Sequence, residues 1–167
     1  MIDRTIDYYL ARTSNGSTLS QVVHAWVAAR RDLGQSFAAL CEALRSDVDD
    51  TQGGTTAEGV HIGAMAGTVD LIERCYPGLT IRDDAVWFDP AVPPELGWYS
   101  FNIRFRGNRL DVRVSATGIE LEAQGRTIII DLGLPLTAEF ASADLLPPIP
   151  GLKDGGKDAP LAVILSH

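Results

Sequence analysis

Cysteine, positive charge and long apolar segments are all scarce in this sequence, and each shortage excludes a class of protein. Its two cysteines, Cys41 and Cys75, lie in stretches with helical spacing and have no neighbouring Cys or His at ligand spacing. We therefore expect buried thiols rather than a disulfide or a zinc site. Only 14 Lys and Arg stand against 22 Asp and Glu, a formal charge of −8, which disfavours nucleic acid and membrane lipid as partners.

No apolar run approaches the roughly 20 residues that cross a bilayer. The first residues, from Met1 to Arg4, include acidic and basic side chains and do not open an apolar signal segment. A cytoplasmic location is the resulting expectation. Hydrophobic residues make up 46% of the chain and charged residues 22%, a composition that predicts a packed globular core. The length of 167 residues fits one ordinary domain, or part of one domain followed by a small second one.

The first half of the chain predicts helices. Apolar residues recur at intervals of three and four from Leu19 to Val27 and again from Phe37 to Leu44. Ser17 or Thr18 is placed to cap the first of these helices. The second is predicted to end in the acidic run 47–50 and the glycines that follow it.

A third helix is predicted from Thr55 to about Cys75. Its start carries the Thr-x-x-Glu order of a capping box, with Glu58 as the fourth residue. Glycine inside a helix costs roughly 1 kcal/mol relative to alanine, so a cluster of small residues there needs a packing reason. The cluster consists of Gly59, Gly63, Ala64 and Gly67. It indicates close approach between helices.

The second half predicts an antiparallel sheet, and the change falls at residues 76–78, a Tyr-Pro-Gly helix stop. Apolar residues alternate with polar ones in short runs separated by turn sequences, from Leu79 to Leu121. Charged residues of opposite parity predict one solvated face: Arg104, Arg106, Arg109, Asp111 and Arg113. For Trp87 and Trp98, packing against neighbouring aromatic residues is favoured over a role as sugar platforms. The segment after Asp131 is rich in Pro and Gly and predicts an extended, partly disordered tail.

Two loops share a design that suits an anion. Residues 13–18 and 53–56 consist of small and hydroxylated residues that lead into predicted helix starts. Free backbone N–H groups, the positive end of the helix dipole and nearby hydroxyls together favour a group such as phosphate. His61, one turn into the third predicted helix, adds a possible donor. Ordinary helix capping is the alternative for either loop.

Longer sequence motifs in the same regions resemble those of glycoside hydrolase family 65. In the helical half they are RTSNGSTLS at 12–20, VHAW at 23–26 and QGGTTAEGVHIGAMAGT at 52–68; in the sheet half they are AVWFDP at 85–90, PPEL at 93–96 and FNIRFRG at 101–107. The resemblance spans residues 2 to 123. The family includes maltose, trehalose and kojibiose phosphorylases and related hydrolases.

The resemblance implies an α+β fold. Family members contain a β-sandwich, an (α/α)6 barrel and a small C-terminal β-sheet domain. Residues 1–77 of this chain would form the last helices of the barrel, residues 78–133 the antiparallel β domain, and residues 134–167 a Pro/Gly-rich tail. The resemblance does not extend to that tail.

The resemblance also implies a phosphate site. The loop before the first helix and the His of the Glu-Gly-x-His sequence line that site in the family's phosphorylases, which assigns Ser14, Gly16, Ser17 and His61, with Thr13 adjacent. Asn15 departs from the family pattern, where His or another polar residue is usual. Inorganic phosphate would be the co-substrate, with no other cofactor and no metal.

Inverting cleavage of a glycoside needs an acid on the leaving oxygen while phosphate or activated water attacks the opposite face. The family's general acid lies in an earlier barrel segment that this chain lacks. Glu58 is the one carboxylate within the motifs; it is either a capping-box partner or a direct participant in the site.

The expected function is thus the C-terminal portion of an inverting phosphorylase or hydrolase of α-glucosyl disaccharides of the trehalose, maltose or kojibiose type. Its partners would be the disaccharide, phosphate, and the rest of the barrel in another chain or a homo-oligomer. The alternative is a non-catalytic interaction or carbohydrate-binding module derived from that family.

Overall fold

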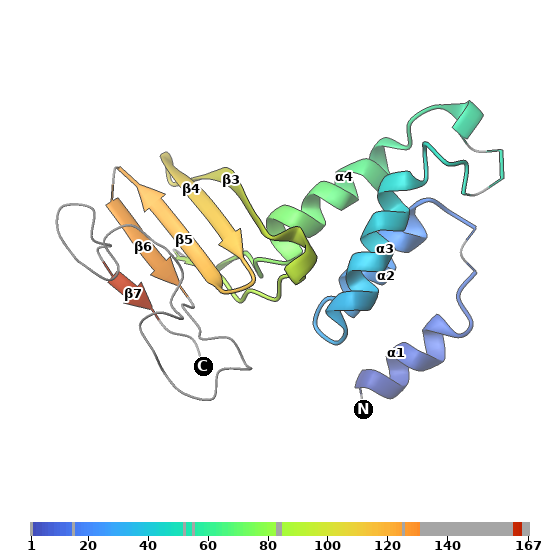
Figure 1. Cartoon of the computed structure of the whole chain (residues 1–167), viewed down its shortest axis with the longest axis horizontal. Helices are drawn as coiled ribbons and strands as arrows, with labels where there is room; N and C mark the ends of the chain where they lie inside the picture. Colours follow the sequence, from blue (N-terminus) through green and yellow to red (C-terminus); the bar gives the residue numbers. More distant parts are fainter. Residues whose placement is uncertain are drawn as a thin grey trace. The chain divides into compact units, whose positions relative to one another are not determined.

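The structure is a computed structural model that describes residues 2–14, 16–51, 53–54, 56–82, 85–124, 126–130 and 162–164. The chain divides into two units, residues 1–76 and 77–167. Helices make up the first unit and strands the second (Figure 1). The predicted α+β class, with helices before an antiparallel sheet, is confirmed.

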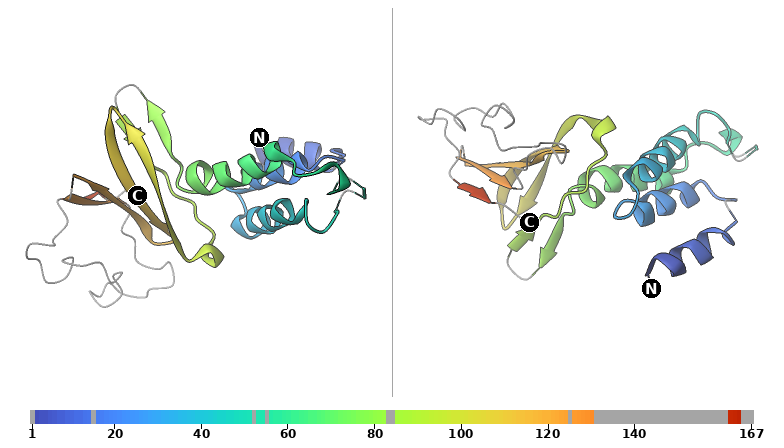
Figure 2. Two further views of the ribbon diagram at one scale, coloured as in Figure 1. Left: turned by 90° about the horizontal axis from the view of Figure 1, so that it is seen from above. Right: turned by 60° about the horizontal axis from the view of Figure 1, so that its bottom comes forward.

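Four α-helices lie in the described part of the first unit: α1 (Ile2–Leu10), α2 (Leu19–Ala28), α3 (Leu33–Arg45) and α4 (Ile62–Asp70). Helix α4 continues as a π-helical turn, Leu71–Cys75. Helices α2 and α3 form a hairpin in which Asp32 caps α3 by accepting a hydrogen bond from the N–H of Gln35 at 2.9 Å. Figure 2 shows α4 packed alongside this hairpin.

The third helix begins later than predicted. Residues Thr56–Glu58 form a separate 3-10 turn, and α4 starts at Ile62 with His61 in the N-cap position. Gly59 has a φ of +99°, a left-handed conformation that cannot continue a right-handed helix. The predicted start of this helix is therefore wrong, and Thr55 itself lies outside the described residues; the predicted end near Cys75 is confirmed.

Helices α2 and α4 run parallel and touch along their length. A Cβ atom on Gly63 would lie 3.8 Å from Leu19 Cδ2, and one on Gly67 would lie only 2.6 Å from Val22 Cγ1. Further along, the guanidinium of Arg74 lies 5.2 Å from the ring centre of Trp26. The contacts advance in the same direction on both helices, so the two N-termini lie at the same end. Close helix approach is confirmed at Gly67; Gly59 lies outside the helix.

The core of the helical unit is made of small and medium apolar side chains with one buried polar network. Ala25, Ala43, Ala64 and Leu71 are fully buried. Ser36 is also buried and donates its hydroxyl to the carbonyl of Ala25 at 2.7 Å. Because that bond uses the only hydroxyl hydrogen of Ser36, the 3.0 Å contact with Tyr76 is donated by the tyrosine. This network ties α2, α3 and the end of the π-turn together.

The second unit contains a five-stranded sheet and a separate two-stranded ribbon. Its strands are β1 (Thr80–Arg82), β2 (Ala85–Trp87), β3 (Trp98–Phe105), β4 (Asn108–Ser115), β5 (Gly118–Ala123), β6 (Arg126–Ile130) and β7 (Ala162–Ile164). Strands β3 to β6 form the predicted antiparallel meander, and β1 pairs antiparallel with β2. Strand β7 pairs parallel with β6. No strand was predicted there; the other residues of 134–167 lie outside the described part of the chain.

The register of the meander confirms one apolar and one solvated face. Phe101 pairs with Val112, which pairs with Leu121 on the next strand. On the other face, Arg113 pairs with Glu120, and their charged groups are 3.5 Å apart.

The packing prediction for the two tryptophans is wrong. Trp87 is 54% exposed and Trp98 is 67% exposed. Each lies near an arginine instead: the guanidinium of Arg82 is 5.8 Å from the ring centre of Trp87, and that of Arg113 is 5.5 Å from Trp98.

Both cysteines are free thiols. Cys75 is buried, and burial raises its pKa to about 11, so it is an inert core thiol. Cys41 is only partly buried. Within the described residues, no helix is long and apolar enough to cross a membrane.

Replacement of the two α4 glycines by alanine tests the helix contact. Gly67→Ala places its methyl group against buried Val22 and is expected to destabilise the chain by about 1–3 kcal/mol, despite the better helix propensity of alanine. Gly63→Ala, with room for its Cβ, is expected to be neutral or to stabilise by up to about 1 kcal/mol. Urea denaturation of both variants measures the difference. Equal effects of the two substitutions would contradict the close contact.

Candidate functional site

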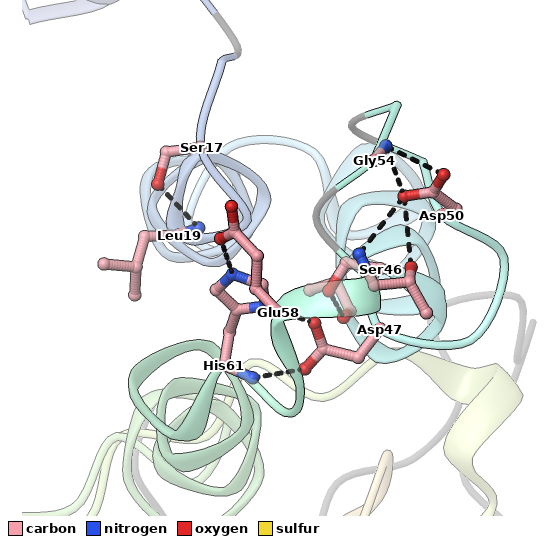
Figure 3. A network of polar contacts seen from close by, with 10 residues as sticks. Ser17, Leu19, Ser46, Asp47, Asp50, Gly54, Glu58 and His61 are labelled. Atoms are coloured by element: carbon pink, nitrogen blue, oxygen red, sulfur yellow. Dashed lines mark hydrogen bonds and ion pairs between the residues drawn. The ribbon is translucent and has the colours of Figure 1, made fainter.

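The starts of helices α2 and α4 lie side by side and bring predicted site residues together. Leu19 is the first residue of α2, and its Cδ2 lies 3.8 Å from the position that a Cβ would take on Gly63, the second residue of α4. Ser17 precedes α2, and His61 is the N-cap of α4. Figure 3 shows both side chains at this junction, with Glu58 beside them. The loop before α2 and the His61 segment therefore lie at the same end of the two helices.

The loop before α2 presents its polar groups to solvent. Ser14, Gly16 and Ser17 are exposed. The hydroxyl of Ser17 accepts a hydrogen bond from the N–H of Leu19 at 3.3 Å, which leaves its own hydrogen available to a ligand. Thr13, by contrast, donates its hydroxyl to the carbonyl of Tyr9 at 2.7 Å.

Asn15 lies outside the described residues. Of the two capping candidates, Ser17 contributes a side-chain hydrogen bond at the start of α2, whereas Thr18 is buried and makes no cap bond.

The second predicted anion loop, residues 53–56, already holds an anion from its own chain. The carboxylate of Asp50 accepts hydrogen bonds from the N–H of Gly54 at 2.8 Å and from the N–H and hydroxyl of Thr56 at 3.2 and 3.1 Å. These amides do not open an α-helix, because Thr56 begins only the 3-10 turn and α4 begins six residues later. The prediction of N–H groups free for phosphate is therefore wrong at Gly53, Gly54 and Thr56, whereas Thr55 lies outside the described residues.

His61 is held by a buried carboxylate. Asp47 accepts hydrogen bonds from the backbone N–H of His61 at 2.8 Å and contacts its ring Nδ1 at 2.6 Å (Figure 3). The side chain of Asp47 is 8% exposed and that of His61 is 28% exposed. The hydrogen bond to the His61 ring lowers the pKa of Asp47; burial opposes this effect, and the bond from the backbone N–H adds to it.

Glu58 stands at the outer side of the ring. Its Oε2 lies 4.0 Å from His61 Nε2, and its side chain is 73% exposed. The ring thus lies between two carboxylates, one buried and one exposed. Because Glu58 is in a separate 3-10 turn, its assignment as a capping-box partner of α4 is not supported.

The start of α4 adds donors to the junction. The N–H groups of Ile62 and Gly63 have no intrahelical acceptor by position, and the described side chains supply none. The helix dipole makes this end partly positive. Among the described residues, no group of three His, Cys, Asp or Glu side chains could hold a metal ion.

The roles of Asp47 and Asp50 as hydrogen-bond acceptors were not predicted from the sequence, where the acidic run 47–50 indicated only a helix end. Asp50 binds the N–H groups of residues 4 and 6 positions further along the chain, and Asp47 binds that of His61, 14 positions further along. A carboxylate just before Gly-Gly is a local signal that could have identified Asp50. No local signal identifies Asp47, since its partner is distant in sequence.

The comparison with known proteins follows the same two units. Residues 1–70 match the sequence model of the glycosyl hydrolase family 65 central catalytic domain, and residues 79–133 match that of the family's C-terminal domain. The chain belongs to glycosyl hydrolase family 65.

Several relatives in the family resemble this chain. It is 50% identical over 123 residues to an uncharacterized glycosyl hydrolase of Mycobacterium tuberculosis, covering 74% of this chain and 9% of that protein. It is 40% identical over 109 residues to trehalose 6-phosphate phosphorylase of Lactococcus lactis, covering 65% and 14%. It is 30% identical over 115 residues to α,α-trehalose phosphorylase of Geobacillus stearothermophilus, covering 68% and 15%.

A solved structure, described as a candidate kojibiose phosphorylase from the human microbiome, superposes with a TM-score of 0.60 at 25% identity. The match covers 74% of this chain and 18% of that one. The family 65 chain described here therefore spans less than a fifth of the length of these relatives.

Asp47→Asn tests the lowered pKa of Asp47. A carboxyl whose pKa is lower in the folded state stabilises the fold above its unfolded value, near 3.8, and this contribution is lost as the pH falls through the folded-state pKa. We expect the variant to be less stable than the parent at pH 7 and the difference to shrink below pH 3.8. Denaturant unfolding at a series of pH values measures it. A difference that stays constant with pH would show that the Asp47 charge contributes nothing.

Proposed function

We propose that this chain supplies the phosphate- or water-binding side of the active site of an inverting enzyme that cleaves α-glucosyl disaccharides. The observation that supports this most is the meeting of two helix starts, where the Ser17 hydroxyl, the His61 ring and the N–H groups of Ile62 and Gly63 gather. The general acid comes from a part of the catalytic domain outside this chain.

The gathered groups suit a tetrahedral oxyanion. Ser17 offers a hydroxyl hydrogen, the N-terminus of α4 offers backbone N–H groups, and a protonated Nε2 of His61 offers a charged donor. Ser14 and Gly16 belong to the same exposed loop and complete the proposed phosphate-binding set with Ser17 and His61. Phosphate held here would attack the sugar from the face opposite the general acid.

The position of Glu58 bears on whether water or phosphate is the nucleophile. Its carboxylate, 4.0 Å from His61 Nε2, repels a phosphate dianion but is well suited to accept a proton from an attacking water. Several relatives are named as phosphorylases, which favours phosphate as the nucleophile.

The substrate and the partner are part of the same proposal. Three relatives are named for trehalose or its 6-phosphate and one for maltose, so an α,α-linked glucoside is favoured over maltose and kojibiose. Along α2, the side chains of Leu19, Val23 and Val27 are 47%, 56% and 37% exposed, one apolar stripe at helical spacing. We expect the rest of the barrel, in another chain or a second copy of this one, to cover that stripe.

Phosphate titration of the isotopically labelled chain tests the site. We expect saturable chemical-shift changes at the amides of Ser17, Leu19, Ile62 and Gly63, because these surround the proposed oxyanion. His61→Gln is expected to weaken binding by about tenfold or more, from the loss of a charge-assisted hydrogen bond. His24→Gln removes the other described histidine, on α2, and is expected to leave binding unchanged.

Sodium chloride at matched ionic strength is the control for general charge effects. Shifts that are absent, or that chloride reproduces, would refute the phosphate site. Without the general acid, the chain by itself is expected to turn over no trehalose, maltose or kojibiose.

A carbohydrate-binding module is the second candidate, and Trp98 favours it. This side chain is 67% exposed on the solvated face of the sheet, where Ser100 and Asn102 follow it at the same parity. An exposed indole with neighbouring polar groups can stack on a sugar ring. Shifts at Trp98 on addition of trehalose, without phosphate-induced shifts near His61, would support this alternative.

A further inference from the structure

We propose that Asp47 is a positioning residue that keeps the proton of His61 on Nδ1 and directs Nε2 toward the junction of α2 and α4. The binding of phosphate at Nε2 rests on the proposed function. The position of the proton on the His61 ring does not. None of the sequence motifs includes Asp47.

The geometry of the pair leaves the histidine little freedom. One oxygen of Asp47 accepts from the backbone N–H of His61 at 2.8 Å, and the other contacts ring Nδ1 at 2.6 Å. Main chain and ring of the same residue are therefore bound by a single carboxylate. This fixes both the place where α4 begins and the orientation of the ring.

The contact also decides which nitrogen carries the proton. An ionised carboxylate only accepts hydrogen bonds, so Nδ1 must be the donor, and in the neutral ring Nε2 is then the unprotonated nitrogen. The carboxylate stays ionised because the hydrogen bond from the His61 ring lowers the pKa of Asp47.

Two helix ends act in opposite directions on the negative charge of Asp47, and the start of α4 is the one that stabilises it. Asp47 follows the C-terminal end of α3 at Arg45, where the helix dipole disfavours an anion. It also lies at the N-terminus of α4, whose dipole and the N–H of His61 favour one. With a side chain only 8% exposed, Asp47 is held by these donors rather than by water.

The consequence concerns Nε2. With Nδ1 committed to Asp47, a neutral His61 offers an acceptor at Nε2, which suits a hydroxyl or a water. An anionic oxygen at Nε2 requires a second proton on the ring, giving an imidazolium between Asp47 and the anion. The charged groups that the structure places against the ring are Asp47 on the Nδ1 side and Glu58, 4.0 Å from Nε2.

Nitrogen NMR of the imidazole rings in the full chain tests the proposal. At a pH where the histidines are neutral, we expect His61 to show the signature of a protonated Nδ1 and an unprotonated Nε2. His24, which has no such carboxylate contact among the described residues, is the internal reference. Asp47→Ala is expected to shift the His61 signals toward the Nε2-protonated form.

Asp50→Asn is the matched control, because it neutralises a carboxylate three residues away that binds a different loop. It is expected to leave the His61 signals unchanged. If Asp47→Ala does not fold, the same spectra are recorded for Asp47→Asn, which keeps one acceptor oxygen. This variant should show a mixture of the Nδ1-protonated and Nε2-protonated forms of His61. A protonated Nε2 in the parent chain, or no change on loss of the Asp47 charge, would overturn the proposal. Failure of phosphate to bind, with the Nδ1 proton in place, would refute only the proposed function.

Discussion

Helices α2 and α4 meet where Gly67 presses against Val22, and the arrangement of the candidate site depends on that contact. A Cβ on Gly67 would lie 2.6 Å from the valine side chain, so the two helices approach as closely as a missing side chain permits. Because they run parallel, the contact sets both N-termini at one end. The Ser17 loop and His61 thus become neighbours although 44 residues separate them in sequence.

Two carboxylates occupy backbone donors that would otherwise be free, one at the candidate site and one in the neighbouring loop. Asp50 closes the glycine-rich loop on itself, and Asp47 anchors His61 at the start of α4. The donors that remain open to a ligand come from the Ser17 loop and the first residues of α4. The structure therefore narrows the two-loop anion hypothesis to one loop and one helix start.

Local patterns predicted the elements better than they predicted how those elements join. Helical spacing identified α2 and α3, and alternation identified strands β3 to β5 of the meander, because each pattern follows from burial of one face. The start of α4 was misplaced since the Thr-x-x-Glu sequence outweighed Gly59, whose positive φ depends on the surrounding loop. Asp47 could not be predicted, because its partner is fixed by tertiary contact. Trp98 was misjudged because aromatic residues in strands usually pack, whereas this one faces solvent.

Nuclear Overhauser spectroscopy of the full chain tests the central claim, that the starts of α2 and α4 adjoin. A cross-peak between the Leu19 methyl groups and the Hα protons of Gly63 is predicted, since Leu19 Cδ2 lies 3.8 Å from the Cβ position of that glycine. Its absence, in a chain that still shows the contact between Val22 and Gly67, would mean that the helix starts diverge and that the proposed oxyanion pocket does not form.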